Sequence, residues 1–180
     1  MTTERGTYEQ IDGQYALRFV RDLAHPIEQV WDAVTTPEGL AAWFPCRIEG
    51  DLLSVGAALR FVFDDDHPEV EGTAGGTVLQ VEPPTTLRFS WEAEELRLLL
   101  GPHGQTGCRL TFIDLMPEDY TPGAARTAAG WHVCLDELTE NLRTGAGTAP
   151  GPEPTPQWRA RYEEYVADGV PHGAPVPGAD

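Results

Sequence analysis

The stretch TPGAARTAAGWHVCLDELTENLR at residues 121–143 decides the fold, because it has the pattern of one long amphipathic helix. Thr121 followed by Pro122 is a typical helix start: the hydroxyl can cap free N–H groups, and the proline stands where its missing N–H is not needed. Apolar residues then recur at the spacing of one buried helical stripe, namely at Ala124, Ala128, Trp131, Leu135, Leu138 and Leu142. Gly145 follows as a stop signal. We therefore predict a single long helix with one buried face.

The chain before this helix alternates apolar and polar residues with the period of β-strands. The alternating stretches are residues 15–20, 58–63, 87–91, 95–100 and 109–112, and Gly72, Gly75 and Gly76 indicate a bent or bulged strand over residues 70–81. His25-Pro26 and Thr36-Pro37 each open a short helix after the first strand. The predicted order is one strand, two short helices, about six antiparallel strands and one long helix.

A single sheet with one solvated face must cover its apolar face, and only the long helix has the length to do so. The expected fold is therefore α+β. Strand parity turns one set of side chains inward: Leu17, Phe19, Phe61, Phe63, Leu87, Phe89, Trp91, Leu98 and Phe112. The arginines at 18, 60, 88, 97 and 109 take the opposite parity and are expected on the solvent face.

The composition favours a globular domain with a strongly acidic surface. The formal net charge is −17, from 29 acidic and 12 basic residues, and every basic residue is arginine. Such a surface repels nucleic acids and anionic membranes, so neither is expected as a partner. Three dispersed cysteines and the lack of a signal peptide or an apolar span indicate a cytoplasmic protein.

The sequence divides into three parts. Residues 1–13 are polar and are expected to be loose, residues 14–144 form the domain, and residues 145–180 are a Pro/Gly-rich tail. Within the tail, Thr155-Pro156 opens a short amphipathic helix near residues 156–167 with Trp158, Tyr162 and Tyr165 at helical spacing. A bare aromatic stripe on a short helix requires a docking surface. That surface is expected on its own domain or on the second copy of a homodimer, with a foreign partner as the alternative.

Three segments together resemble a known family. They are PIEQVWDAVTTPEGLAAWFP at residues 26–45, GTVLQVEPPTTLRFSW at 76–91 and GWHVCLDELTENL at 130–142. The chain is similar over about residues 14–144 to the SRPBCC (START-like) proteins, and within them to the subgroup named after the activator of Hsp90 ATPase (AHSA1-like). The resemblance implies a helix-grip fold, in which a curved antiparallel sheet grips a C-terminal helix around a cavity. It implies no shared catalytic residue.

Aromatic residues are the candidates for a ligand cavity. Trp43 and Phe44 match the family's position near the cavity mouth, while Trp91 and Trp131 match its strand and helix tryptophans; the alternative for all four is plain packing. Gly130, unfavourable inside a helix, leaves room for close packing or for a ligand. The complete set of predicted cavity residues is Trp43, Phe44, Phe61, Phe63, Phe89, Trp91, Phe112, Trp131 and Leu135.

Catalytic and metal-binding patterns are weak. His132 and Asp136 stand four residues apart on the long helix, but off its apolar stripe, so they are interpreted mainly as a surface pair. Asp64, Asp65, Asp66 and His67 lack the spacing of calcium or zinc ligands and are interpreted as a solvated turn. Cys134 is expected as a core residue and His103 as a turn residue. No metal, cofactor or catalytic residue is predicted.

Three functions are left open by the sequence. The leading one is binding of a small hydrophobic or aromatic molecule between the sheet and the long helix. The second is an enzyme of cyclase, dehydratase or hydrolase type, which requires polar groups inside the cavity; the orientations of Glu71, Thr73 and His132 bear on it. The third is a co-chaperone or other protein-interaction role, which the subgroup's name and the aromatic tail helix suggest.

Overall fold

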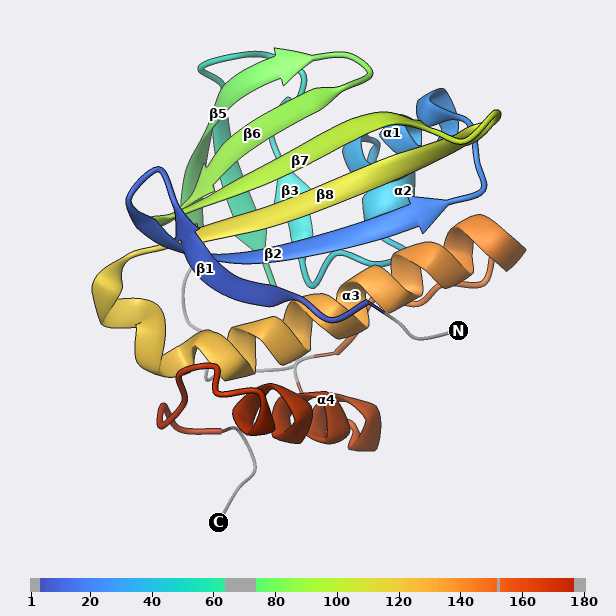
Figure 1. The fold of residues 1–180 in the computed structure, drawn as a ribbon. Helices are drawn as coiled ribbons and strands as arrows, with labels where there is room; N and C mark the ends of the chain where they lie inside the picture. Colours follow the sequence, from blue (N-terminus) through green and yellow to red (C-terminus); the bar gives the residue numbers. More distant parts are fainter. Residues whose placement is uncertain (1–3, 64–73, 152, 177–180) are drawn as a thin grey trace.

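A computed structural model describes residues 4–63, 74–151 and 153–176, and it shows an eight-stranded antiparallel sheet covered on one face by a long helix (Figure 1). The strands are β1 Thr7–Ile11, β2 Gln14–Leu23, β3 Arg47–Glu49, β4 Ala58–Val62, β5 Ala74–Glu82, β6 Thr86–Trp91, β7 Glu94–His103 and β8 Gly107–Met116. The helices are α1 Ile27–Thr35, α2 Pro37–Leu40, the 3-10 turn η1 Glu118–Gly123, α3 Ala124–Thr144 and α4 Pro156–Ala167. The strand order β1-β2-β8-β7-β6-β5-β4-β3 and the helix across the sheet confirm the α+β helix-grip prediction.

The long helix α3 begins two residues later than its sequence pattern suggests, at Ala124 with Gly123 at the cap position. Thr121 does not cap it; its hydroxyl donates instead to the carbonyl of Glu118 at 2.8 Å inside the 3-10 turn. The end is as predicted, because Gly145 takes a left-handed conformation (φ 75°) and its N–H donates to the carbonyl of Asn141 at 2.7 Å. The C-terminal end of α3 is therefore specified by local backbone chemistry, whereas its N-terminal end is set by the 3-10 turn η1 that precedes it.

The two short helices follow the predicted signals. Pro26 precedes α1, and the Thr36 hydroxyl caps α2 by accepting from the N–H of Gly39 at 3.1 Å. Strand β5 is irregular, with a register shift between Val78 and Gln80 in its pairing with β6. The predicted bulge is therefore present in residues 74–82, while residues 70–73 lie outside the described part of the chain.

The apolar face of the sheet and α3 share one core. Seven members of the predicted inward set are fully buried, and Phe63 and Trp91 are partly buried. The buried seven are Leu17, Phe19, Phe61, Leu87, Phe89, Leu98 and Phe112. Arg18, Arg60 and Arg109 are exposed on the opposite face, as their parity predicts. Burial of these side chains is the main term that holds the helix against the sheet.

The expectation that residues 1–13 are loose is wrong for residues 7–11. They form β1, which pairs with β2 along its length, and Tyr8 stacks on Tyr15 with ring centroids 5.8 Å apart. The turn between the strands uses Asp12 and Gly13, both with positive φ, which is the geometry of a tight hairpin. The Asp-Gly pair in the sequence was the signal for this hairpin.

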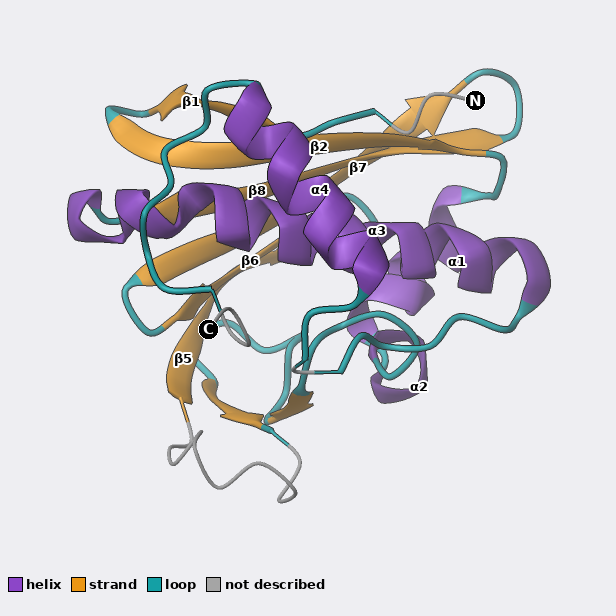
Figure 2. Cartoon of the chain, turned by 90° about the horizontal axis from the view of Figure 1, so that it is seen from below, coloured by secondary structure: helices purple, strands orange, loops and turns teal. Residues whose placement is uncertain are grey.

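The tail helix α4 docks on its own domain. Thr155 caps it by accepting from the N–H of Trp158 at 3.1 Å, as predicted. Figure 2 shows α4 lying across α3. Tyr165 is completely buried, and Trp158 stacks on Tyr162 with ring centroids 5.4 Å apart. The aromatic stripe thus packs within the molecule, with Tyr165 buried and Trp158 and Tyr162 partly buried.

Candidate functional site

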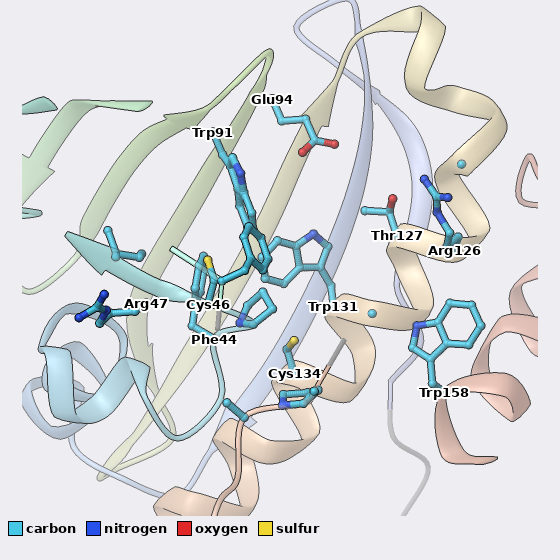
Figure 3. A pocket seen from close by; sticks show the side chains of 18 of the residues that line it. Phe44, Cys46, Arg47, Trp91, Glu94, Arg126, Thr127, Trp131, Cys134 and Trp158 are labelled. Carbon is cyan, nitrogen blue, oxygen red and sulfur yellow. The ribbon is translucent and has the colours of Figure 1, made fainter. Parts of the chain in front are cut away.

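A cavity of about 1030 Å³ lies between the sheet, α2, the N-terminal half of α3 and the tail (Figure 3). Its wall takes residues from β3, the end of β4, the β6–β7 hairpin, η1 and α3. Residues 149–151, Glu153, Pro154 and Trp158 close it from the tail side. The tail is therefore part of the cavity wall, a role that the sequence did not indicate.

Aromatic rings from separate elements form much of this wall. The indole of Trp91 stacks on Phe61 with ring centroids 4.6 Å apart, and it lies 5.7 Å from the ring of Phe44. The edge of Trp131 on α3 approaches Trp91 at 6.1 Å, and Trp158 lines the cavity from α4. Together they give a surface suited to a flat apolar molecule.

The predicted cavity residues divide into two groups. Four of them line the cavity: Phe44, Phe63, Trp91 and Trp131. The other five, Trp43, Phe61, Phe89, Phe112 and Leu135, are buried in the packed core and do not line it. Trp43 links the segment after α2 to α1, because its indole N–H donates to the carbonyl of Ala33 at 3.0 Å. The periodicity of the sequence predicts which side chains face inward. It does not predict which of them line a cavity and which are packed in the core.

Sequence reasoning missed two acidic residues on the inward face of the sheet, one in the cavity wall and one in the packed core. Glu94 on β7 lines the wall, and Asp114 on β8 is completely buried. One oxygen of Asp114 accepts the Trp131 indole N–H at 2.8 Å, and the other has no partner within the described residues. Both acids stand at inward parity, Glu94 with Leu96 and Asp114 with Phe112, which was the available signal.

The protonation of this pair is shifted by its surroundings. Burial, and then the nearby charge of Asp114, raises the pKa of Glu94 to about 8, while the charge of Arg126 lowers it. Burial also raises the pKa of Asp114, against the lowering effect of the Trp131 hydrogen bond. Burial therefore favours the protonated form of this pair, and an arriving positive charge would favour release of its proton.

Burial disfavours the thiolate form of the two cysteines in the cavity wall. Burial raises the pKa of Cys46 to about 12 and raises the pKa of Cys134 as well. Both sulfurs line the cavity as neutral thiols, and all three cysteines are free. Because the thiolate is the nucleophilic form, these residues serve as apolar wall rather than as nucleophiles.

The interpretation of His132 and Asp136 as a surface pair is wrong for the histidine. His132 is fully buried under α4, where its Nδ1 lies 2.7 Å from the Tyr165 hydroxyl. That hydroxyl accepts the N–H of Gly6 at 2.9 Å, so its own proton is assigned to His132 Nδ1. Burial, followed by the charges of nearby arginines, lowers the pKa of His132 to about 3. The histidine is a neutral link between elements and does not line the cavity.

Other candidate groups give no second site. Residues 64–67, Glu71 and Thr73 lie outside the described residues, and His103 is exposed at the end of β7. In the described ranges, no three His, Cys, Asp or Glu side chains converge in a way that could hold a metal ion. Nor does any helix in those ranges have the length and hydropathy that crossing a bilayer requires.

A comparison with known protein families matches the part of the chain that contains most of the sheet and nearly all of α3. The family described as activator of Hsp90 ATPase homolog 1-like protein matches residues 24–143, which is more than half of the chain. The chain belongs to this family. The match ends within α3, so the tail that lines the cavity of this AHSA1-like protein lies outside the matched residues.

Solved structures share the fold of this AHSA1-like protein. A conserved protein of unknown function from Enterococcus faecalis, EF2215, is 22% identical over 91% of both chains with a TM-score of 0.68. CalU16 from Micromonospora echinospora is 23% identical over 93% of this chain and 98% of its own, with a TM-score of 0.64. DynU16, from the dynemicin biosynthetic locus, is 27% identical over 73% of this chain and 48% of its own, with a TM-score of 0.62. A comparison with curated proteins gave no match.

Proposed function

We propose that this AHSA1-like protein binds a small, mainly hydrophobic and aromatic molecule in the cavity between the sheet, α3 and the tail. The observation that carries this function is the cavity of about 1030 Å³ with Phe44, Trp91, Trp131 and Trp158 in its wall. A volume of this order is typical of pockets that enclose ligands of drug size. The location of DynU16 in a biosynthetic locus supports a small organic ligand.

The helix α3 leaves room for such a ligand. Gly130 lines the cavity, and a Cβ at this position would meet only the Trp158 indole nitrogen, at 3.8 Å. The glycine is therefore not required by close packing against the sheet. Its cost of about 1 kcal/mol in helix propensity relative to alanine fits a position that keeps the cavity open.

The alternatives have unequal support. The aromatic stripe of α4 was one reason to consider a co-chaperone role. That stripe packs against its own domain, where Tyr165 is fully buried, so it gives this role little support. An enzyme of cyclase, dehydratase or hydrolase type gains one specific observation, the carboxyl group of Glu94 in the cavity wall, whose pKa is raised by burial. With the three cysteines present as free thiols, the cytoplasm is the proposed compartment.

Filling the cavity from α3 tests the binding function. Thr127 lines the cavity wall opposite the sheet (Figure 3), so Thr127→Phe would occupy ligand space. We expect the affinity for naphthylethanol, measured by isothermal titration calorimetry, to fall at least about tenfold, which corresponds to about 1.4 kcal/mol.

Thr127→Val is the matched control, because it changes the chemistry of the side chain with little change in its size. Its affinity should stay within about twofold of the parent protein. Equal affinity in the parent protein and in Thr127→Phe, with both folded by circular dichroism, would place the ligand elsewhere.

A further inference from the structure

The acidic end of the cavity has a geometry that the aromatic wall does not explain. Glu94 and Asp114 project from neighbouring strands onto the same face of the sheet, since Leu96 of β7 pairs with Asp114 of β8. The side chain of Asp114 has no exposed surface, and its Oδ1 is buried without a partner among the described residues. Asp114 does not itself line the cavity, but a buried carboxyl oxygen without a donor is costly, so the pair of acids that Glu94 brings to the cavity wall lacks a hydrogen-bond donor or a cation.

Acidic groups outnumber basic groups in the cavity wall. Besides Glu94, the ionisable groups of the wall apart from the thiols and Tyr120 are Arg47, Asp119, Arg126 and Glu153. Arg47 pairs with Glu49 at 3.1 Å, and Arg126 donates to the carbonyl of Pro175 at 2.7 Å. Among the described residues, Arg126 is the cation that lowers the pKa of Glu94, and it does not offset the effect of burial. The whole chain, at −17, adds an attraction for cations.

Aromatic rings next to a carboxyl group are suited to one kind of ligand group. The faces of tryptophan and phenylalanine attract a cation, and a carboxylate adds a charge-assisted hydrogen bond to an ammonium group. A ligand carboxylate would disfavour ionisation of Glu94, and a hydroxyl could make only a neutral hydrogen bond to its carboxyl group. The wall therefore discriminates by charge as well as by shape.

We propose that Glu94, supported by Asp114, binds the ammonium group of an aromatic ligand that carries a basic amine. This assignment rests on the proposed binding function and names the chemical class of its ligand. On binding, the positive charge of the ammonium group replaces the proton that neutralises the carboxyl pair. That proton is released to solvent, so ligand and proton compete for the same site.

Three probes with one aromatic body and different polar groups test the assignment. They are naphthylethylamine, naphthylethanol and naphthylacetate, titrated calorimetrically into the full chain at about pH 7.5. We expect the amine to bind at least about tenfold more tightly than the alcohol, and the carboxylate to bind more weakly than both. Equal affinities for amine and alcohol would overturn the assignment while leaving the cavity function intact. Failure of all three to bind would overturn both proposals for ligands of this size.

Glu94→Gln keeps the size of the side chain and removes its ability to ionise. In this variant we expect the preference for the amine over the alcohol to shrink to about twofold or less. Glu163→Gln, on the exposed face of α4, makes the same chemical change away from the cavity and should keep the full preference. If the preference for the amine survives in Glu94→Gln, it arises from the overall charge of the protein, and the assignment of Glu94 as the binding group is wrong.

Proton release gives a readout that a purely structural role would not change. Titrations in two buffers with different ionisation enthalpies should show that amine binding releases protons, because the ammonium group favours the ionised carboxyl form. Binding of the alcohol should release none, and Glu94→Gln should reduce the release for the amine. Proton release that is the same for amine and alcohol would contradict competition at this site.

Discussion

At the scale of single residues, Asp114 is the least expected feature of the core. A carboxyl side chain stands among Leu110, Phe112 and Met116 on the inward face of β8, where every neighbour in the parity pattern is apolar. Its hydrogen bond to Trp131 links the sheet to α3, and its burial raises its pKa. Because burial penalises the charged form, Asp114 costs the folded state more as the pH rises.

Asp114→Asn should therefore change how stability depends on pH. The raised pKa means that the stabilising contribution of the protonated form is present at low pH and is lost as the pH rises above the unfolded value. We expect the free energy of unfolding of the variant, relative to the parent protein, to increase between about pH 4 and 7, by at most about 1.4 kcal/mol per pH unit. Urea denaturation at several pH values measures this difference. A difference that is constant with pH would mean that Asp114 ionises equally in the folded and unfolded states.

At the scale of elements, the tail helix α4 is held by a polar link as well as by its aromatic rings. Tyr165 contacts two other elements: its hydroxyl accepts the N–H of Gly6 before β1 and lies 2.7 Å from His132 on α3. Asp136 on α3 lies 3.7 Å from both Arg21 of β2 and Arg161 of α4. Since these groups are buried or partly buried, the link stabilises the docking of α4 on the domain.

Tyr165→Phe should loosen this docking without removing an aromatic ring. The change leaves the Gly6 N–H and His132 Nδ1 without their partner, so we expect the free energy of unfolding to fall by about 1–3 kcal/mol. Hydrogen exchange should also speed up in α4. Tyr162→Phe is the matched control on the same helix, because Tyr162 is only partly buried, and it should change stability by about 0.5 kcal/mol or less. Equal effects of the two variants would show that the hydroxyl link is not significant.

At the scale of the whole molecule, charge is the dominant surface property. The net charge of −17 makes the folded chain repel itself, and most of its ion pairs are on or near the surface. Surface pairs such as Arg109 with Asp22 contribute little each and are screened by salt. The repulsion among excess acidic groups is screened as well.

Salt should therefore stabilise this protein. We expect the melting temperature to rise when NaCl is increased from about 20 mM to about 0.5 M, because the Debye length falls and the repulsion of the excess acids outweighs the weakened surface pairs. Differential scanning calorimetry measures the shift, and KCl should give the same increase as NaCl. A melting temperature that falls with salt would show that the ion pairs dominate.

Much of the fold could be predicted because its signals are local and repetitive. Helix α3, the helix starts at Thr36 and Thr155, the stop at Gly145 and the inward parity of the strands follow from spacing and from capping chemistry. The hairpin of β1 was missed because its short strand is polar, and the Asp-Gly turn was not weighed. The site was predicted only in part, since Phe44, Phe63, Trp91 and Trp131 line the cavity whereas Glu94 and Asp114 were not considered.

The sequence by itself determined which elements form, in which order, and which side chains face the core. These properties depend on the spacing of apolar residues and on backbone chemistry within a few positions of each other. Only the tertiary structure decided where the cavity lies, that the tail closes it, and that His132 is buried beneath α4. The physical reason is that a void and the environment of a buried charge depend on how closely distant elements pack, and neither is written in local spacing.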